Sequence, residues 1–168
     1  MITKQFLNLT MNRIFGDGAF TQVKDVKGSE QKVKHTTYDT TFVEDCVNLR
    51  SIQLTSLGNP GVVFLNGGSD PSADDYTSDG TVVTGLSVVA TVTNNNGADG
   101  VGVTCVYGIT NNNDFDVTID EVCWIALKRN TSNSQRLFLA DRTKLENPIT
   151  IAAGGMGKIT YTVATNML

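Results

Sequence analysis

From residue 61 onward the chain alternates apolar strands with clusters of turn residues, and this pattern limits the possible folds more than any other feature. Between the clusters apolar and polar residues alternate, and no stretch of helical periodicity intervenes. Strands joined by short turns predict a mainly β fold, an antiparallel β-sandwich or a jelly-roll-like domain. The expected strands cover residues 61–65, 81–93, 101–110, 116–127 and 135–144, with an irregularity at residues 120–121.

The end of the chain predicts a β-hairpin. A short strand begins after Pro148, residues 154–157 supply a glycine-rich turn, and a final strand follows. In that final strand Ile159, Tyr161 and Val163 share one face, and threonines occupy the other. Nothing in this pattern provides a group for catalysis, so we interpret it as the construction of a surface.

Residues 2–15 predict an α-helix that ends at the following Gly-Asp-Gly. At about 100° per residue its apolar side chains fall on two separate stripes. A helix that covers only its own domain needs one stripe, so the second stripe predicts a contact with a neighbouring subunit. The alternative is a short helix beneath a loop, with an irregular apolar pattern. The candidate assembly interface consists of Phe6 and Leu9 on one stripe and Met11 and Ile14 on the other.

The segment between this helix and the strands is less regular. Residues 22–35 are polar and rich in lysine, and they predict an exposed hairpin that turns at residues 27–29. Residues 43–50 fit a helix or a strand, and we expect irregular structure with a short helix. We therefore divide the chain into an N-terminal helix or arm, residues 1–18, and a single β-sandwich domain, residues 19–168.

The composition favours a protein that acts through contacts with other proteins. The length of 168 residues suffices for one domain with a single core, and the charged fraction of 18% is low. Neutral polar surfaces suit subunit contacts, because charges at an interface must be desolvated. The net charge of −4 and the lack of a basic stripe argue against a nucleic-acid partner.

The cysteines and the lack of long apolar runs bear on the compartment. Cys46, Cys105 and Cys123 form no C-x-x-C pair and lie in apolar or strand-like stretches, so we expect buried free thiols in a reducing cytoplasm. No segment approaches the roughly 18 consecutive apolar residues of a membrane span. The start of the chain lacks the apolar region and cleavage site of a signal peptide. We therefore expect synthesis in the cytosol and no membrane partner.

No residue set in the sequence predicts catalysis, and we expect no cofactor. The single histidine, His35, lies in a lysine-rich polar stretch, and we interpret it as solvated rather than as part of a triad or metal cluster. The motifs of serine hydrolases, P-loops and dinucleotide-binding folds are absent from the sequence. Trp124 lies in an expected strand and is predicted to be in the core.

One loop is dense in possible metal ligands, and it contains Asp70, Asp74, Asp75 and Asp79. Carboxylate oxygens at this density suit Ca²⁺, although their spacing does not match an EF-hand loop. Asp and Ser side chains also cap backbone N–H groups in turns such as those around Pro71 and Gly80. We favour the turn interpretation and expect no metal.

Five segments occur together in an order that is known from one family of proteins. They are residues 62–64, 67–76, 104–112, 116–122 and 140–151, the last followed by the glycine-rich end. On these segments the chain resembles small virion-associated proteins encoded by tailed bacteriophages, notably phages of gut bacteria. The resemblance covers residues 61–165 and, loosely, residues 4–8. The chain departs from the family pattern at residues 64–67 and 77–78.

The resemblance implies a non-enzymatic structural protein of the virion that is synthesised in the host cytoplasm. We expect a capsid decoration or auxiliary head protein that contacts other virion proteins, such as major capsid or tail proteins, and forms a homo-oligomer. The alternative within this class is a tail, connector or fibre-base component. The alternative from another class is a carbohydrate-binding adhesin module, for which Tyr38 and Tyr76 are the candidate exposed aromatic residues. The family offers no catalytic residues to transfer.

Overall fold

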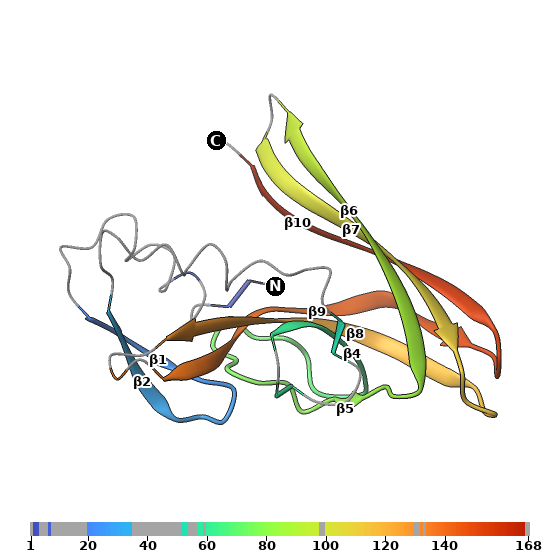
Figure 1. The fold of residues 1–168 in the computed structure, drawn as a ribbon, viewed down its shortest axis with the longest axis horizontal. Coiled ribbons are helices and arrows are strands. Elements are labelled where there is room, and N and C mark those ends of the chain that lie inside the picture. Colours follow the sequence, from blue (N-terminus) through green and yellow to red (C-terminus); the bar gives the residue numbers. More distant parts are fainter. Residues whose placement is uncertain are drawn as a thin grey trace.

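The structure is a computed structural model that describes residues 2–3, 7, 20–34, 52–53, 57–58, 60–97, 100–129, 132 and 134–166 (Figure 1). The named elements within these residues are all β-strands. They are β1 (Phe20–Lys24), β2 (Glu30–Lys34), β3 (Ile52–Gln53), β4 (Gly61–Asn66), β5 (Thr81–Val82), β6 (Leu86–Gly97), β7 (Gly100–Asn111), β8 (Val117–Arg129), β9 (Gln135–Ile151) and β10 (Met156–Asn166).

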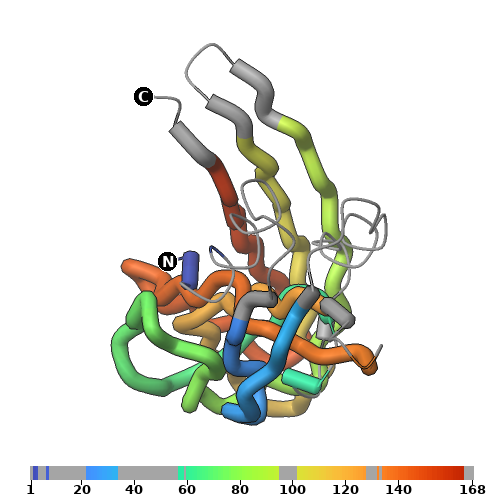
Figure 2. Tube along the Cα trace, turned by 90° about the vertical axis from the view of Figure 1, so that its left-hand side faces the viewer, coloured from blue at the N-terminus to red at the C-terminus, as the bar shows by residue number. Residues whose placement is uncertain are grey.

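The strands form three sheets. A three-stranded sheet has the order β10-β7-β6, and a five-stranded sheet has the order β3-β4-β8-β9 with β5 paired to β4. The third sheet is the β1–β2 hairpin. All pairs are antiparallel except β3 with β4, so the prediction of a mainly β, antiparallel fold is confirmed. Figures 1 and 2 show that the two larger sheets meet at one end and that the three-stranded sheet rises away from the other.

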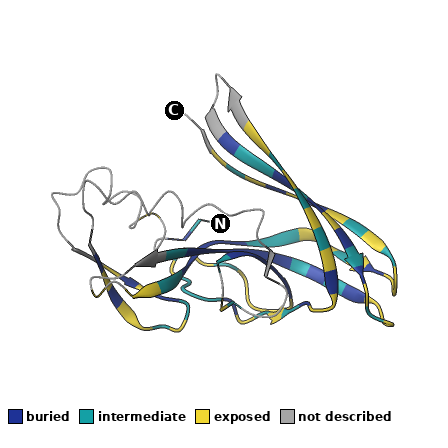
Figure 3. Ribbon diagram, in the orientation of Figure 1, coloured by how far each residue is buried: buried dark blue, intermediate teal, exposed yellow. Residues whose placement is uncertain are grey.

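The main hydrophobic core lies between the two larger sheets, where both contribute buried side chains (Figure 3). The rings of Phe64 in β4 and Tyr107 in β7 make an edge-to-face contact with centroids 5.5 Å apart. The hydroxyl of Tyr161 in β10 donates to Asp141 Oδ2 in β9 at 2.6 Å. Trp124 is buried in the same core, as predicted. Aromatic and polar contacts therefore both connect the two sheets.

The predicted alternation is confirmed in the strands that line this core. In β10, Ile159 and Tyr161 are buried whereas Thr160 and Thr162 are exposed. The irregularity expected in β8 is also present, because its register with β9 shifts just before Glu121. Period-two patterning therefore identified the buried face of these strands correctly.

The lysine-rich segment forms the predicted hairpin, with β1 paired to β2. Asp25 is buried in its turn and accepts hydrogen bonds from two backbone N–H groups of the turn. The predicted exposure is wrong for one side of the hairpin, because Val23 and Val33 are buried with Phe138 of β9. The hairpin thus covers part of the five-stranded sheet.

The predicted terminal hairpin is wrong. β9 continues as one strand through Pro148 to Ile151 and pairs with β8, whereas β10 pairs with β7 in the other sheet. The glycine-rich turn therefore carries the chain from one sheet to the other. Both strands bury apolar residues in a core that the two sheets share, so their alternation alone could not identify the strand with which each one pairs.

The predicted strand at residues 81–93 is two strands, β5 and β6, which belong to different sheets. They are separated by a turn at Gly85, whose φ of 73° is in the left-handed region that favours glycine. A Cβ atom at this position would also collide with the side chain of Asn113. This turn therefore depends on glycine for both its conformation and its packing.

Two further turns carry the chain between the sheets, and the buried side chain of Asn111 at the end of β7 holds both. Its Nδ2 lies 2.8 Å from Phe115 O in the β7–β8 turn. It also lies 3.1 Å from the carbonyl oxygens of Ile151 and Ala152, where β9 ends. Its Oδ1 accepts the N–H of Asn113 at 3.0 Å. One amide group therefore joins the β7–β8 turn to the β9–β10 turn.

The start of the chain lies against the edge of β9. Ile2 forms a β-bridge with Asp141, and the N–H of Thr3 donates to Ala140 O at 3.1 Å. Thr3 is fully buried, and its hydroxyl donates to Leu139 O. The predicted N-terminal helix therefore does not begin at Ile2.

Several predictions fall on residues outside the described part of the chain. They concern the candidate interface of Phe6, Leu9, Met11 and Ile14 with most of the N-terminal helix, the segment 43–50, His35, Tyr38 and Cys46. The division into an arm, residues 1–18, and a domain, residues 19–168, also stays a prediction.

We expect Asn111→Ala to lower the free energy of unfolding by roughly 1–3 kcal/mol for each buried polar group that it leaves without a partner. Denaturant unfolding followed by circular dichroism measures this change. Asn112→Ala is the matched control, because the Asn112 side chain is exposed and its Nδ2 donates to the exposed Ser87 hydroxyl at 2.8 Å. Equal stabilities of the two variants would contradict the role of Asn111.

Candidate functional site

A buried ionic cluster centres on Arg142 of β9, which is 2% exposed. Its Nε donates to Oε1 of the fully buried Glu121 in β8 at 2.7 Å. Its Nη1 donates to Asp75 Oδ2 at 2.8 Å, and its Nη2 donates to Asp79 Oδ1 at 2.9 Å. Nη2 also donates to Ser69 O at 2.7 Å. These bonds attach the long loop between β4 and β5 to the five-stranded sheet.

The register of β8 and β9 positions the cluster on the sheet face that points away from the three-stranded sheet. Arg142 lies opposite Cys123, which packs with the apolar residues of that face. Glu121 is two residues from Cys123 and therefore shares its face. The Cys123 thiol and the Ser78 hydroxyl both donate to Glu121 Oε1, at 3.1 and 2.7 Å. The carboxylate is thus supplied with donors from the strand, the loop and Arg142.

Two members of the cluster, Arg142 and Asp79, have pKa values that are shifted in the direction that keeps them charged. Burial lowers the pKa of Arg142, but hydrogen bonds to Glu121 and Asp75 outweigh burial and raise the pKa above its ordinary value. The backbone N–H of Ser69 lowers the pKa of Asp79. Arg142 therefore carries a permanent positive charge that the loop carboxylates balance.

The acidic loop performs the turn role that its sequence predicts. The N–H of Ser72 donates to Asp75 Oδ2 at 2.8 Å, and the N–H of Ser69 donates to Asp79 Oδ1 at 3.0 Å. The N–H of Gly80 donates to the nearby Ser78 hydroxyl. Two of the four aspartates therefore bond both the loop backbone and Arg142. No group of three His, Cys, Asp or Glu side chains within the described residues is arranged to hold a metal ion.

Arg142→Leu should lower the free energy of unfolding by about 3–5 kcal/mol, because it removes the closer cation of the buried Glu121 carboxylate and leaves only Lys144, whose Nζ lies 3.7 Å from Glu121 Oε2. The double variant Glu121→Leu, Arg142→Leu should recover part of this loss, since it removes both buried charges. Chemical denaturation of the three proteins provides the comparison. Lys158→Leu, at an exposed position of β10, is the control and should change stability by no more than about 0.5 kcal/mol. A small effect of Arg142→Leu would mean that solvent or Lys144 compensates the charge of Glu121.

Calcium should leave the thermal midpoint of the protein unchanged, because Arg142 already bonds two of the four loop carboxylates, those of Asp75 and Asp79. A ligand that binds only the folded state at a hundred times its Kd would add about 2.7 kcal/mol of stability. Melting curves in millimolar calcium and in chelator test this directly. A rise of several degrees with calcium would show that the aspartates are ligands.

The two described cysteines have the properties of structural thiols. Cys105 and Cys123 are free and buried, as predicted. Burial raises the pKa of the Cys123 thiol, and the neighbouring Glu121 carboxylate raises it further. Because the thiolate is the reactive form, Cys123 is poorly suited to act as a nucleophile.

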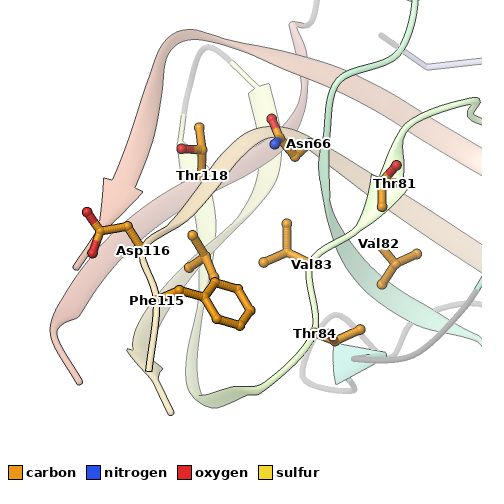
Figure 4. A pocket seen from close by; sticks show the side chains of 9 residues that line it. Asn66, Thr81, Val82, Val83, Thr84, Phe115, Asp116 and Thr118 are labelled. Atoms are coloured by element: carbon orange, nitrogen blue, oxygen red, sulfur yellow. The ribbon is translucent and has the colours of Figure 1, made fainter. Parts of the chain in front are cut away.

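A surface pocket of about 330 Å³ lies between the β7–β8 turn and the segment that joins β4 to β6 (Figure 4). Phe115 and Asp116 line one side, and Val83 and Thr84 line the other. Asp116 accepts a hydrogen bond from the N–H of Ala153 at 3.0 Å. The only titratable side chain in this pocket is therefore a partner of the β9–β10 turn, and the pocket contains no acid–base pair.

Tyr76 lines a second, polar pocket of about 220 Å³ together with Asp75, Asp79 and Arg142. The β1–β2 hairpin packs against its ring. A Cβ atom on Gly28 would lie 3.1 Å from the ring, and Lys24 Nζ lies 5.4 Å from the ring centroid. A sugar-binding platform needs an open ring face, so this arrangement disfavours Tyr76 as a carbohydrate-binding residue.

The outer face of the three-stranded sheet is nearly free of charged residues. Residues opposite one another across the sheet make rows, such as Thr91, Val106 and Thr160. Of these strands, only β10 contains a charged residue, Lys158. The remaining members of this face are Ser87, Val89, Thr93, Thr104, Gly108, Thr110, Met156, Thr162 and Ala164.

This face carries little charge and exposes two large apolar side chains. Val89 is 75% exposed and Met156 is 82% exposed. Interfaces are depleted in charged residues at their centres, and methionine is enriched there. The hydroxyls of Thr104 and Thr162 are hydrogen-bonded to each other at 2.9 Å on the sheet surface, so some polar groups of the face already have a partner within the chain.

The sequence interpretation missed two residues that organise the structure, Arg142 and Asn111. A signal for Arg142 existed, because Glu121 and Arg142 are charged residues within segments that the sequence predicts as strands. Asn111 carried no such signal, since it is one of several asparagines that end strands.

Comparisons of the chain with models of protein families, with curated proteins and with solved structures found no match. None of the described residues belongs to a helix that is long and apolar enough to cross a membrane.

Proposed function

We propose that the chain is a non-enzymatic structural protein of a bacteriophage virion, a capsid decoration or auxiliary head protein that acts through protein–protein contacts. Its partners would be other virion proteins, such as major capsid or tail proteins, and further copies of the chain. The proposal places the protein in the virion after synthesis in the host cytoplasm. It requires neither a cofactor nor a metal.

The observation that carries this proposal is the neutral outer face of the three-stranded sheet. The face presents threonine, valine, serine and methionine side chains with a single lysine, and the sheet rises beyond the end of the core (Figure 2). Binding through such a face desolvates few charges. The sheet is braced by the core at one end, so little conformational entropy is lost when a partner binds.

Two further arguments support the proposal. The segments at residues 67–76 and 140–151 resemble those of phage virion-associated proteins, and they form the loop and the strand that Arg142 joins. Two packed antiparallel sheets are also consistent with the sandwich class, and we include a β-sandwich or jelly-roll-like domain in the proposal. The N-terminal interface of Phe6, Leu9, Met11 and Ile14 remains part of the proposal as a second contact.

Gold-labelled antibodies against the chain, applied to phage particles in negative-stain microscopy, test this function. Label on the heads is expected, because a decoration protein covers the capsid. Label confined to the tail or the connector would favour a tail, connector or fibre-base component. Particles from which the gene is deleted provide the control. Label on neither part of the particle would reject both structural roles.

The remaining alternatives give different results in solution. Clear binding on a glycan array that Tyr76→Ala removes would favour a carbohydrate-binding adhesin module. Hydrolysis of glycans or peptides above background would contradict a non-enzymatic role.

A further inference from the structure

β6 is an edge strand of the three-stranded sheet, and its outer side pairs with no other strand in the described part of the chain. It is 12 residues long, and it contains neither a charged residue nor a proline. Its register with β7 is unbroken from Leu86↔Asn111 to Gly97↔Gly100. A long, regular and uncharged edge is a template for pairing with another strand.

The direction of the backbone groups identifies which residues would form that pairing. The N–H of Asn112 donates to Gly85 O at 2.9 Å, so the carbonyl of Gly85 points toward β7. The N–H of Leu86 belongs to the same trans peptide and points away from β7. Because these directions alternate along a strand, the N–H and C=O groups of Val88, Ala90 and Val92 also point toward the free edge.

Other edges of the molecule carry features that discourage such pairing. The edge of β9 is occupied by Ile2 at Asp141, and this strand also contains Pro148. The opposite edge of the three-stranded sheet, β10, carries Lys158. Lysine and proline on edge strands are devices that prevent association. β6 has none of them.

We propose that β6 pairs with β6 of a second copy of the chain, antiparallel about a two-fold axis, and joins two three-stranded sheets into one of six strands. This inference names a contact for the homo-oligomer of the proposed function and rests on that function for its biological meaning. The pairing itself is inferred from the length, the regular register and the lack of charge of β6.

A second copy suits this edge because β6 is complementary to itself. With the two-fold axis at Ala90, Val88 lies opposite the partner's Val92, and Val89 lies opposite the partner's Thr91. Side chains that line the inner face meet inner-face side chains, and outer-face residues meet outer-face residues. Five opposed pairs that each exchange two hydrogen bonds would give about ten bonds. No charge opposes a like charge in this arrangement.

The test combines sedimentation equilibrium with site-resolved hydrogen exchange of the full chain. The mass should move between one and two chains as concentration rises. The amides of Val88, Ala90 and Val92 should exchange at least about tenfold more slowly at high concentration than after dilution, since they form hydrogen bonds only in the pair. Neither measurement needs a variant.

Two variants distinguish association through the edge of β6 from association through the outer face of the sheet. Ala90→Pro removes an outward-facing N–H, a position at which an edge strand tolerates proline, and should abolish the dimer. Thr160→Lys, in the neighbouring cross-strand row and on the far strand β10, should leave it intact. Circular dichroism checks that both variants fold. If Ala90→Pro does not fold, the concentration dependence of hydrogen exchange in the unmodified chain decides whether β6 pairs.

Three results would overturn the pairing: a monomer at every concentration, edge amides whose exchange is independent of concentration, or a dimer lost in Thr160→Lys. None of them affects the labelling of particles. Conversely, a β6 dimer in solution with unlabelled particles would overturn the proposed function alone.

Discussion

The hydrogen bonds of the Asn111 amide join two of the turns at which the chain passes from one sheet to the other, the β7–β8 turn and the β9–β10 turn. Such turns leave carbonyl groups outside the strand ladders, and here they lie beside the buried end of the core. A buried carbonyl without a donor is costly, so the turns need a partner that the backbone does not supply. Because one side chain serves both turns, the ends of β7 and β9 are held together. The position of the three-stranded sheet follows from this connection.

The Arg142 cluster has a different role. It lies on the face of the five-stranded sheet that points away from the three-stranded sheet. A buried ion pair is weak grounds for stability, because desolvation offsets much of the attraction. Its effect here is geometric: a planar guanidinium bonds Glu121, Asp75 and Asp79 in fixed directions. A loop rich in Ser, Asp and Gly has little apolar surface to bury. The cluster therefore determines where this loop lies, in place of hydrophobic packing.

The sequence predicted which residues face the core more reliably than which strands pair. Alternation placed Ile159 and Tyr161 inside, and it located the irregularity before Glu121. It could not show that β9 and β10 separate into two sheets, because both bury the same kind of side chain. The organising contacts were also hidden, since Asn111 bonds atoms about 40 residues away along the chain. Long-range polar contacts leave no local pattern, whereas burial does.

The two sheets divide the polar chemistry of the described chain between them. The five-stranded sheet carries buried charged side chains, among them Glu121 and Arg142, and neutralises them internally. The three-stranded sheet carries a single lysine and satisfies its polar needs with hydroxyls and backbone. Charged groups that are already paired within the chain are not available to bind a partner. A neutral face can be covered by a partner without burying an unpaired charge. The same separation explains why the neutral sheet can extend beyond the core: its threonines are satisfied by water when it is alone and by a partner when it is covered.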